Sequence, residues 1–437
     1  MATPDRPLPN TGPFSPPRVL FVHNGAPGRF APLAAAMLAR GWQGALINGP
    51  TGTDIPGLAT RRFTLRHGPG DCAFAPARRI EHALLMGRGA AQAAQALRDE
   101  GFVPDLIIGH PGWGEMLFLK EVFPGVPQIH LGEYWYHSEG ADSNFDPEFP
   151  ARLLDSRIAV AAQNAQFALS YVDAAAIVAP TRFQAGLIPA SFQPKVHVIH
   201  EGIDTSRIRR TPAEALRLLD GTVLDGSVPV ISFASRRFEP LRGVHVFMRM
   251  LPRFLELAPS AHVVMIGADD PGIYGIAPRA GGTWLAAMKA ELAGRIDWTR
   301  VHVLPSLPHT QLHRVFSSVT AHVYLTYPFV LSWSLLEAMA CEALVVASDT
   351  APVRDAMEDE RNGLLVDFFD GEAMARRLAE VCAAPRRFDA LRAAARRTVV
   401  ERFDRAAICE PAWLELVNAV CGSRSELAGA LPTALLN

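Results

Sequence analysis

The pattern that most restricts the fold of this chain is an alternation of short apolar strands with helices. The apolar run RVLFVH at residues 18–23 is followed by a Gly/Pro loop and then by an Ala-rich helix predicted at 32–40. A second strand is predicted at 43–48. Parallel strands need a helical crossover between them, so this alternation is typical of a parallel sheet covered by helices on both faces. The sequence therefore predicts an α/β fold built on doubly wound sheets.

The alternation begins a second time near residue 228, with the strand VPVISFA and a helix predicted at 244–257. A charged stretch at 201–225 separates the two runs. Two successive α/β domains fit 437 residues better than one. The predicted organisation is a disordered Pro-rich tail at 1–17, a first domain at 18–203, a second domain at 204–403 and a C-terminal helical segment at 404–437.

Composition excludes several classes of protein. The net charge of −2 provides no bulk attraction for nucleic acid. The five cysteines form an odd number without a Cys-x-x-Cys pair, which favours reduced thiols in a cytoplasmic protein over a disulfide framework or a zinc site. No apolar run is long enough to predict a membrane span.

A carboxylate stands inside an otherwise apolar helix, at Glu337 in LLEAMA. One interpretation is a capping box, with Ser334 as N-cap and Glu337 three residues later. The other is a nucleotide site. A helix that opens with Ser332, Trp333 and Ser334 at the carboxyl end of a strand presents backbone N–H groups to an anion, and Glu337 would accept hydrogen bonds from ribose hydroxyls.

This segment resembles the donor half of glycosyltransferase family 4, a group of retaining enzymes with the GT-B fold. LLEAMA matches the second Glu of the family's Glu-x7-Glu motif, whereas Phe329 stands where the first Glu is usual. Together with TYPFVLSWS and EYWYHSEGADSNFDPEFP, this indicates a bacterial subgroup that lacks the first Glu. The resemblance covers roughly residues 18–404. It implies two Rossmann-like domains facing a cleft, with the final helix crossing back to the first domain.

The segment ASRRFEPLRGVHVF resembles the diphosphate-binding segment of the family, with Arg236 and Arg242 as its cationic pair and Gly243 after them. Two guanidinium groups can bind diphosphate oxygens bidentately and neutralise the charge that grows as a glycosidic bond breaks. The structural alternative is a solvated basic loop before a helix.

In the first domain, the loop NGAPGRF occupies the place of the family's Gly-rich phosphate loop. The resemblance assigns Gly25, Gly28 and Arg29 to the donor site, although turn geometry alone would also explain the glycines. His110 follows the strand predicted at 106–109, where the family often has a histidine near the sugar. A structural role for His110 stays open.

The long segment 131–150 follows another strand and combines aromatic with acidic side chains. Such a combination suits a sugar, and Glu133, Tyr134, Tyr136 and Glu139 are the predicted acceptor-binding residues. A calcium or magnesium loop is the alternative, but the EF-hand pattern is missing.

The predicted activity is transfer of a sugar from a nucleotide-diphosphate sugar to a hydroxyl of a bacterial glycan or glycolipid, with His110, Arg236 and Arg242 as catalytic residues. The family chemistry implies retention and requires no metal or cofactor. A non-catalytic sugar-nucleotide-binding subunit is the alternative that Phe329 suggests, and an epimerase is disfavoured by the missing carboxylate. The basic residues Arg78, Arg79 and Arg88 leave peripheral contact with a membrane open. The nucleotide base, the sugar and the oligomeric state are not predicted.

Overall fold

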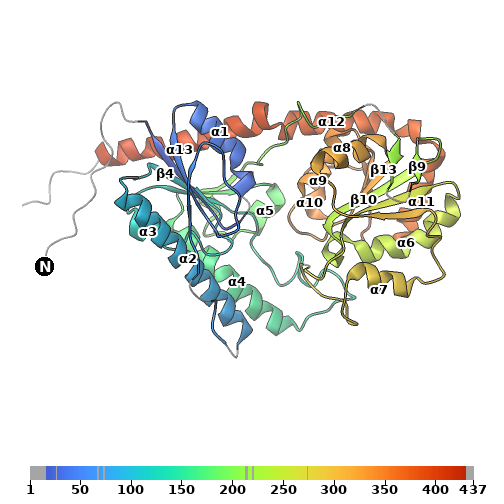
Figure 1. The fold of residues 1–437 in the computed structure, drawn as a ribbon, viewed down its shortest axis with the longest axis horizontal. Helices are drawn as coiled ribbons and strands as arrows, with labels where there is room; N and C mark the ends of the chain where they lie inside the picture. Colours follow the sequence, from blue (N-terminus) through green and yellow to red (C-terminus); the bar gives the residue numbers. More distant parts are fainter. Residues whose placement is uncertain are drawn as a thin grey trace, which may run out of the picture. The chain divides into compact units, whose positions relative to one another are not determined.

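The computed structural model describes residues 16–25, 27–65, 68–71, 74–211, 215–218, 221–272 and 274–429. Most of the predicted Pro-rich tail therefore lies outside the described residues. The chain forms two compact units. Unit 1 comprises residues 1–137, 152–201 and 409–437, and unit 2 comprises residues 138–151 and 202–408. Figure 1 shows a parallel sheet flanked by helices in each unit.

Unit 1 contains a seven-stranded sheet in the order β3-β2-β1-β4-β5-β6-β7. Its strands are β1 (Arg18–His23), β2 (Gln43–Asn48), β3 (Ala59–Arg62), β4 (Leu106–Gly109), β5 (Gln128–Leu131), β6 (Ala176–Ala179) and β7 (Val196–Val198). Its helices are η1 (Pro27–Arg29), α1 (Ala31–Ala39), α2 (Ala75–Asp99), α3 (Leu119–Val122), α4 (Leu153–Asp173), α5 (Arg182–Leu187), η2 (Gln193–Lys195) and α13 (Glu410–Gly429).

The two faces of the unit 1 sheet are both buried, as the apolar strands predict. Val19 and Phe21 of β1 pack in one core cluster with α1 and α13. Leu20 and Val22, which point to the opposite face, pack in another cluster with α2 and α3.

Unit 2 contains a six-stranded sheet in the order β12-β11-β10-β13-β14-β15, and a separate hairpin β8-β9. Its strands are β8 (Leu216–Arg217), β9 (Val223–Leu224), β10 (Val230–Arg237), β11 (His262–Ala268), β12 (Val301–Leu304), β13 (Ala321–Tyr324), β14 (Val345–Ser348) and β15 (Leu364–Val366). Its helices are η3 (Pro240–Arg242), α6 (Val244–Leu257), α7 (Trp284–Glu291), α8 (His309–Ser318), α9 (Trp333–Ala340), α10 (Ala351–Arg354), α11 (Gly371–Ala383), η4 (Pro385–Phe388) and α12 (Asp389–Phe403). A π-helical turn, η5 (Arg405–Cys409), leads into α13.

The same alternation builds the core of unit 2. Val263 and Met265 of β11 pack in a cluster with α6, α7 and α11. Val264 and Ile266 face the other side, in a cluster with α9 and α12. All strand pairs of both large sheets are parallel, which confirms the predicted doubly wound α/β fold.

The strand order reverses at one place in each unit, between β1 and β4 in unit 1 and between β10 and β13 in unit 2. In open α/β sheets, ligands bind outside the carboxyl ends of the strands at such a switch point, because the flanking loops diverge there. The predicted site residues that follow β1, β4, β10 and β13 therefore lie where this architecture favours binding.

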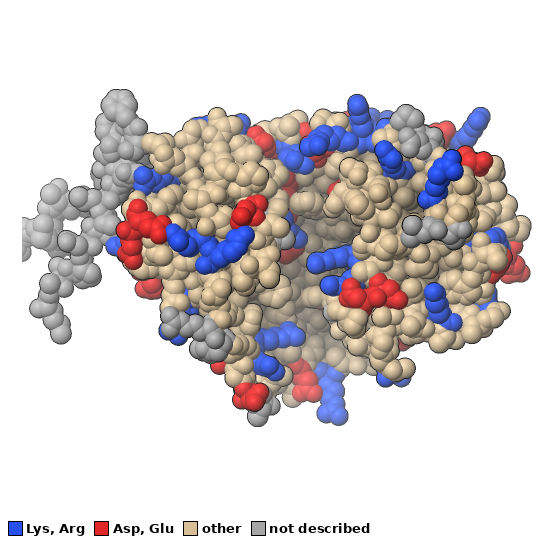
Figure 2. All heavy atoms as spheres, viewed as in Figure 1, with Lys and Arg blue, Asp and Glu red and all other residues tan. Residues whose placement is uncertain are grey.

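Two surface properties bear on the sequence predictions. Figure 2 shows basic and acidic side chains interspersed over the visible face, in agreement with the small net charge. Within the described residues, none of the helices has both the length and the apolar character needed to cross a bilayer. Peripheral contact with a membrane through α2 stays a prediction.

Candidate functional site

Arg242 is held at the switch point of unit 2. Its Nη1 donates a hydrogen bond of 2.8 Å to Thr326 Oγ1, and it lies 3.3 Å from the carbonyl oxygen of Val330 and 3.4 Å from the hydroxyl of Tyr324. The guanidinium carbon is 5.9 Å from the ring centroid of Phe329. These contacts fix a cationic side chain beside the loop that leads into α9.

Gly243 makes this position of Arg242 feasible. Its φ of +71° is a left-handed conformation that glycine adopts without strain. A Cβ at this position would stand 2.5 Å from Leu325 Cβ, a distance that real structures do not show. The glycine therefore allows η3 to turn directly into α6 against the end of β13.

The two other arginines at the end of β10 differ in their surroundings. Arg236 is exposed, whereas Arg237 is half-buried and forms an ion pair of 2.9 Å with Asp270. Arg236 therefore has its charge directed to solvent at the carboxyl end of the strand, as the predicted diphosphate contact requires. Arg237 has a structural partner.

Helix α9 begins two residues earlier than the capping-box hypothesis requires. Ser332 is the N-cap, and its Oγ accepts a hydrogen bond of 3.3 Å from the N–H of Ser334. The N–H of Ser332 in turn donates to the hydroxyl of Tyr324 at 3.0 Å. Glu337 is thus the fifth residue of the helix and not the third. The capping-box interpretation of Glu337 is wrong.

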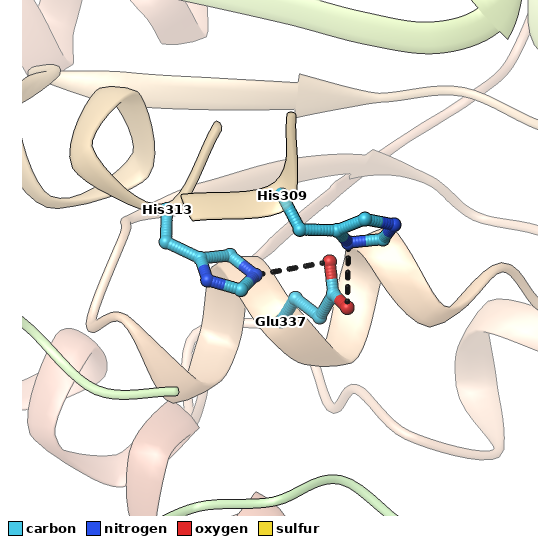
Figure 3. A group of neighbouring side chains, drawn as sticks. All are labelled: His309, His313 and Glu337. Atoms are coloured by element: carbon cyan, nitrogen blue, oxygen red, sulfur yellow. Dashed lines mark ion pairs between the residues drawn. The ribbon is translucent and has the colours of Figure 1, made fainter. Parts of the chain in front are cut away.

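Glu337 faces two histidines of α8, as Figure 3 shows. Its Oε1 lies 3.3 Å from His309 Nδ1, and its Oε2 lies 3.3 Å from His313 Nε2. The Glu337 side chain is only 5% exposed. Burial by itself would raise the pKa of this carboxyl, but the imidazoles of His313 and His309 outweigh burial and hold the pKa below its usual value. The site therefore contains a buried, ionised carboxylate.

Phe329, at the place where the family resemblance predicts a carboxylate, takes part in aromatic packing. Its ring centroid lies 5.0 Å from that of Tyr274 and close to the guanidinium of Arg242. The ring therefore supports the cationic part of the site, and the side chain adds no negative charge beside it.

The switch point of unit 1 holds a network of charged side chains. Arg29, at the end of η1, forms ion pairs with Glu133 and Glu201. Glu133 also contacts His110, with 3.0 Å between Oε2 and Nε2. Burial would raise the pKa of Glu133, but Arg29 and His110 overcome this effect and lower it to about 2. The predicted phosphate-binding Arg29 is thus already paired with two carboxylates of its own unit.

The tautomer of His110 follows from its two contacts. Nδ1 accepts a hydrogen bond of 3.1 Å from the N–H of Gly112, so Nε2 carries the proton and donates to Glu133. His23 lies beside it, with 5.4 Å between the ring centroids. Burial is the largest cause that lowers the pKa of His23 to about 3, and the positive charge of Arg29 acts in the same direction. His23 is therefore neutral at physiological pH.

Two family models match consecutive parts of the chain. The model "Glycosyl transferase family 4 group" matches residues 40–208, and "Glycosyl transferases group 1" matches residues 225–398. The chain belongs to this glycosyltransferase family. The family resemblance and the GT-B fold predicted from the sequence are thereby confirmed.

The individual relatives of this family member are distant in sequence. The D-inositol 3-phosphate glycosyltransferase of Segniliparus rotundus is 26% identical over 218 residues, which are 49% of this chain and 46% of the relative. The chain spans about half the length of the curated relatives it matches. Sucrose-phosphate synthase from Thermosynechococcus elongatus matches the fold with a TM-score of 0.65 at 16% identity, covering 94% of this chain and 98% of that one. HepE from Anabaena, solved in complex with UDP and glucose, matches with a TM-score of 0.60 at 15% identity, covering 95% of this chain and 100% of that one.

The backbone conformation and the surroundings of Gly25 and Gly28, the glycines predicted for the donor site, do not require glycine. Neither Gly25 nor Gly28 is among the described glycines with positive φ, and a Cβ at either position would meet nothing within 4 Å. Turn geometry therefore does not explain them. Their contact with a donor stays a prediction.

The four residues predicted to bind the acceptor do not lie together in one unit. Tyr134 is buried and packs edge-on against Tyr136, and Glu133 belongs to the network around Arg29. Glu139 is exposed and lies in the part of the chain assigned to unit 2. Of the four, only Glu139 is exposed, whereas Glu133 and Tyr136 are half-buried.

The rest of the segment 138–151 is anchored to unit 2 by Asp146. Its Oδ2 accepts hydrogen bonds from His245 Nε2 at 2.8 Å and from the hydroxyl of Tyr327 at 2.6 Å, and its Oδ1 accepts the N–H of Glu148 at 2.9 Å. Burial would raise the pKa of Asp146, but these hydrogen bonds lower it. The carboxylate that suggested a metal loop is occupied by protein donors.

Sequence reasoning did not find His309, His313, Glu201 or His23. The two histidines of α8 have helical i, i+4 spacing, which is a signal in retrospect. Glu201 replaces an asparagine that is usual in the family, which also marks a departure. Nothing local singles out His23 at the end of β1.

Proposed function

We propose that this protein transfers a glycosyl group from a nucleotide-diphosphate sugar to a hydroxyl acceptor, with retention of configuration and without a metal ion or cofactor. The observation that carries the proposal is the convergence at the switch point of unit 2. Arg242, the N-terminus of α9 and the buried carboxylate of Glu337 lie there on adjacent loops and helices. The solved relative HepE with UDP and glucose supports the class of donor.

Each part of this constellation has a role in the proposed reaction. Arg242 and Arg236 bind the diphosphate and stabilise the negative charge that accumulates as the glycosidic bond breaks. The backbone N–H groups in the first turn of α9, which begins after Ser332, add the positive end of a helix dipole. Glu337 accepts hydrogen bonds from the ribose hydroxyls. These groups supply the stabilisation for which other transferases use a metal ion.

We assign binding of the acceptor and contact with the transferred sugar to residues of unit 1. The resemblance places His110 near the transferred sugar, and the contact with Glu133 fixes the orientation of its ring. A glycan or glycolipid is the acceptor that the family resemblance favours. The relative named for D-inositol 3-phosphate adds a phosphorylated polyol as a second acceptor class to test.

A second candidate function is binding of a sugar nucleotide without turnover. Phe329 favours it, because an aromatic ring stands where the family has a carboxylate beside the donor sugar. Both functions require the same nucleotide contacts, so only turnover distinguishes them.

The first experiment is a thermal-shift screen against UDP, GDP, ADP, dTDP and CDP, followed by the corresponding sugars. Saturation of a site stabilises the folded state by about 3 to 4 kcal/mol at 100 to 1,000 times the Kd, which raises the melting temperature visibly. We expect one diphosphate to raise it, and the double variant R236A/R242A to lose the rise. Arg386, an exposed arginine on η4, provides the control variant R386A, which should keep it.

Turnover is then measured with that sugar nucleotide and with glycan, glycolipid and phosphorylated polyol acceptors. NMR of the product should show the anomeric configuration of the donor, and addition of a chelator should not lower the rate. A product with the opposite anomeric configuration would contradict retention. A transfer rate that falls when a chelator is added and recovers when a metal ion is returned would contradict metal independence. Nucleotide binding without transfer or hydrolysis would favour the binding protein.

A further inference from the structure

We propose that His309, His313 and Glu337 form a binding site for a zinc ion. The two histidines are four residues apart on α8, so their side chains lie on the same face of the helix, a spacing that suits a shared metal ion. Glu337 approaches them from α9, and Figure 3 shows both rings directed at its carboxylate. One ligand atom from each residue lies within 4.8 Å of the other two.

The distances between these atoms are compatible with ligation of a shared metal ion. Zinc bonds to imidazole nitrogen and carboxylate oxygen are about 2.0 to 2.2 Å long, so neighbouring ligand atoms of a tetrahedral site are about 3.3 to 3.6 Å apart. His309 Nδ1 lies 3.3 Å from Oε1 of Glu337, and His313 Nε2 lies 3.3 Å from Oε2 of the same carboxylate. An N–H···O hydrogen bond is typically about 2.9 to 3.0 Å long. In addition, His313 Nε2 is buried and forms no hydrogen bond of regular geometry within the described residues, although it lies 3.3 Å from Glu337 Oε2.

The donor set selects the class of metal. Two imidazole nitrogens and one carboxylate oxygen are ligands that zinc accepts, and three protein ligands leave a fourth position for water or another ligand. Calcium and magnesium prefer sites made entirely of oxygen. The ion also has a route to the site, because the side chain of His309 is 73% exposed.

Two other groups in unit 2 lack this combination. Asp146 and His245 are already joined by a hydrogen bond of 2.8 Å, and Asp146 has further protein donors. His262 and His302 share a hydrogen bond of 3.0 Å between their ring nitrogens. An ion at either place would first have to break a hydrogen bond of normal length.

The position of the site has a consequence for donor binding, which rests on the proposed function. If Glu337 holds the ribose, a zinc ion bound to its carboxylate occupies the acceptor oxygens that the ribose hydroxyls need. Zinc and the nucleotide then exclude one another, and zinc inhibits the enzyme without taking part in the reaction.

The test uses the untagged full-length protein, stripped with a chelator and titrated calorimetrically with zinc chloride. The variants H309A and H313A each remove one ligand. We expect each to weaken binding by at least about tenfold, since even the loss of a group that only supports a ligand costs roughly 10- to 100-fold. The matched control is H302A, which removes a histidine of the other pair and should bind zinc as the wild type does. Circular dichroism checks that all variants are folded.

Cobalt substitution identifies the ligands independently. Tetrahedral Co²⁺ held by nitrogen and oxygen gives visible absorption without the near-ultraviolet band of a thiolate ligand. A thiolate band would assign the ion to cysteine and overturn the proposal, as would unchanged zinc affinity in H309A and H313A.

A competition titration separates this proposal from the donor assignment. It measures the affinity for the nucleoside diphosphate found in the thermal-shift screen, with and without zinc. A weakened affinity supports both the zinc site and the ribose contact. Zinc binding that the H309A variant loses, with no effect on nucleotide affinity, supports the zinc site and contradicts the placement of the ribose on Glu337.

Discussion

At the residue scale, each unit contains a carboxylate that is largely shielded from solvent and paired with basic side chains. Glu133 in unit 1 and Glu337 in unit 2 are each kept ionised by neighbouring basic side chains that outweigh the cost of burial. Both lie near a switch point, where open α/β sheets usually bind their ligands. Both side chains are therefore negatively charged in the folded protein before any ligand binds.

Glu133 makes a testable contribution to stability. Its folded-state pKa of about 2 lies below the ordinary value of 4.5, so its ionised form stabilises the folded state above about pH 4.5, and this stabilisation disappears as the pH falls toward 2. The difference corresponds to about 3 kcal/mol. We expect E133Q to lower the melting temperature by several degrees at pH 7, with the difference from wild type shrinking steadily below pH 4.5. A difference that stays constant between pH 7 and pH 3 would contradict this account.

Arg242 and Glu337, two residues of the proposed donor site, were easier to find in the sequence than the side chains that contact them. Arg242 and Glu337 stand in recognisable local patterns, a basic pair before a glycine and an acid inside an apolar helix. Thr326, the partner of Arg242, is 84 positions away from it in the sequence, and His309, a partner of Glu337, is 28 positions away from it. Only the tertiary structure brings them together, and no local pattern encodes that contact.

The ends of a helix could be predicted where the spacing of its apolar residues alone determines them. The helix predicted at 244–257 coincides with α6, whose apolar residues face the sheet on one side. The sequence also predicts a helix at 115–121, but only its last part forms, in the short helix α3 (Leu119–Val122). Gly114 adopts a φ of +104° and lies so close to the backbone of Ala83 in α2 that a Cβ would stand 2.2 Å from its oxygen. This tertiary contact replaces the first turns of the predicted helix with a tight turn.

The start of α9 gives a prediction at the scale of the element. Ser332 caps the helix by accepting the N–H of Ser334, whereas Ser334 is already inside it. Replacing an N-cap serine by alanine costs about 1 kcal/mol, so S332A should lower the melting temperature of unit 2 more than S334A does. S332A should also weaken binding of the nucleoside diphosphate, since it loosens the helix turn that faces the anion. Equal effects of the two variants would show that the cap is not at Ser332.

The chain passes between the two units four times, after residues 137, 151, 201 and 408. The segment 138–151 leaves unit 1 and joins unit 2 through Asp146, and the last helix α13 belongs to unit 1. The apolar residues Trp413, Leu416 and Val417 of α13 lie in the core cluster that contains β1 and α1. Each unit thus completes its core with a piece of chain that is remote in sequence.

This organisation predicts which unit a mutation near the C-terminus weakens. Trp413 is 4% exposed, and removal of a buried tryptophan side chain costs about 3 to 5 kcal/mol. We expect W413A to accelerate hydrogen exchange in β1 and α1 of unit 1, and to leave the amides of β10 and β11 in unit 2 unchanged. W298A, at a half-buried tryptophan of unit 2, is the reciprocal control. Faster exchange in β10 and β11 of W413A would contradict the assignment of α13 to unit 1.

Because the chain crosses between the two units four times, recombination of the gene at a single point cannot exchange one complete unit. A hybrid made by a single crossover near residue 202 would combine the first unit of one parent with a closing helix from the other, and the second unit with a foreign 138–151 segment. Exchange of an intact unit requires matched junctions at all four passages. We therefore expect the specificities for donor and acceptor to be inherited together. A laboratory chimaera should keep the segment 138–151 with unit 2 and the segment 409–429 with unit 1, because these segments complete the cores of those units.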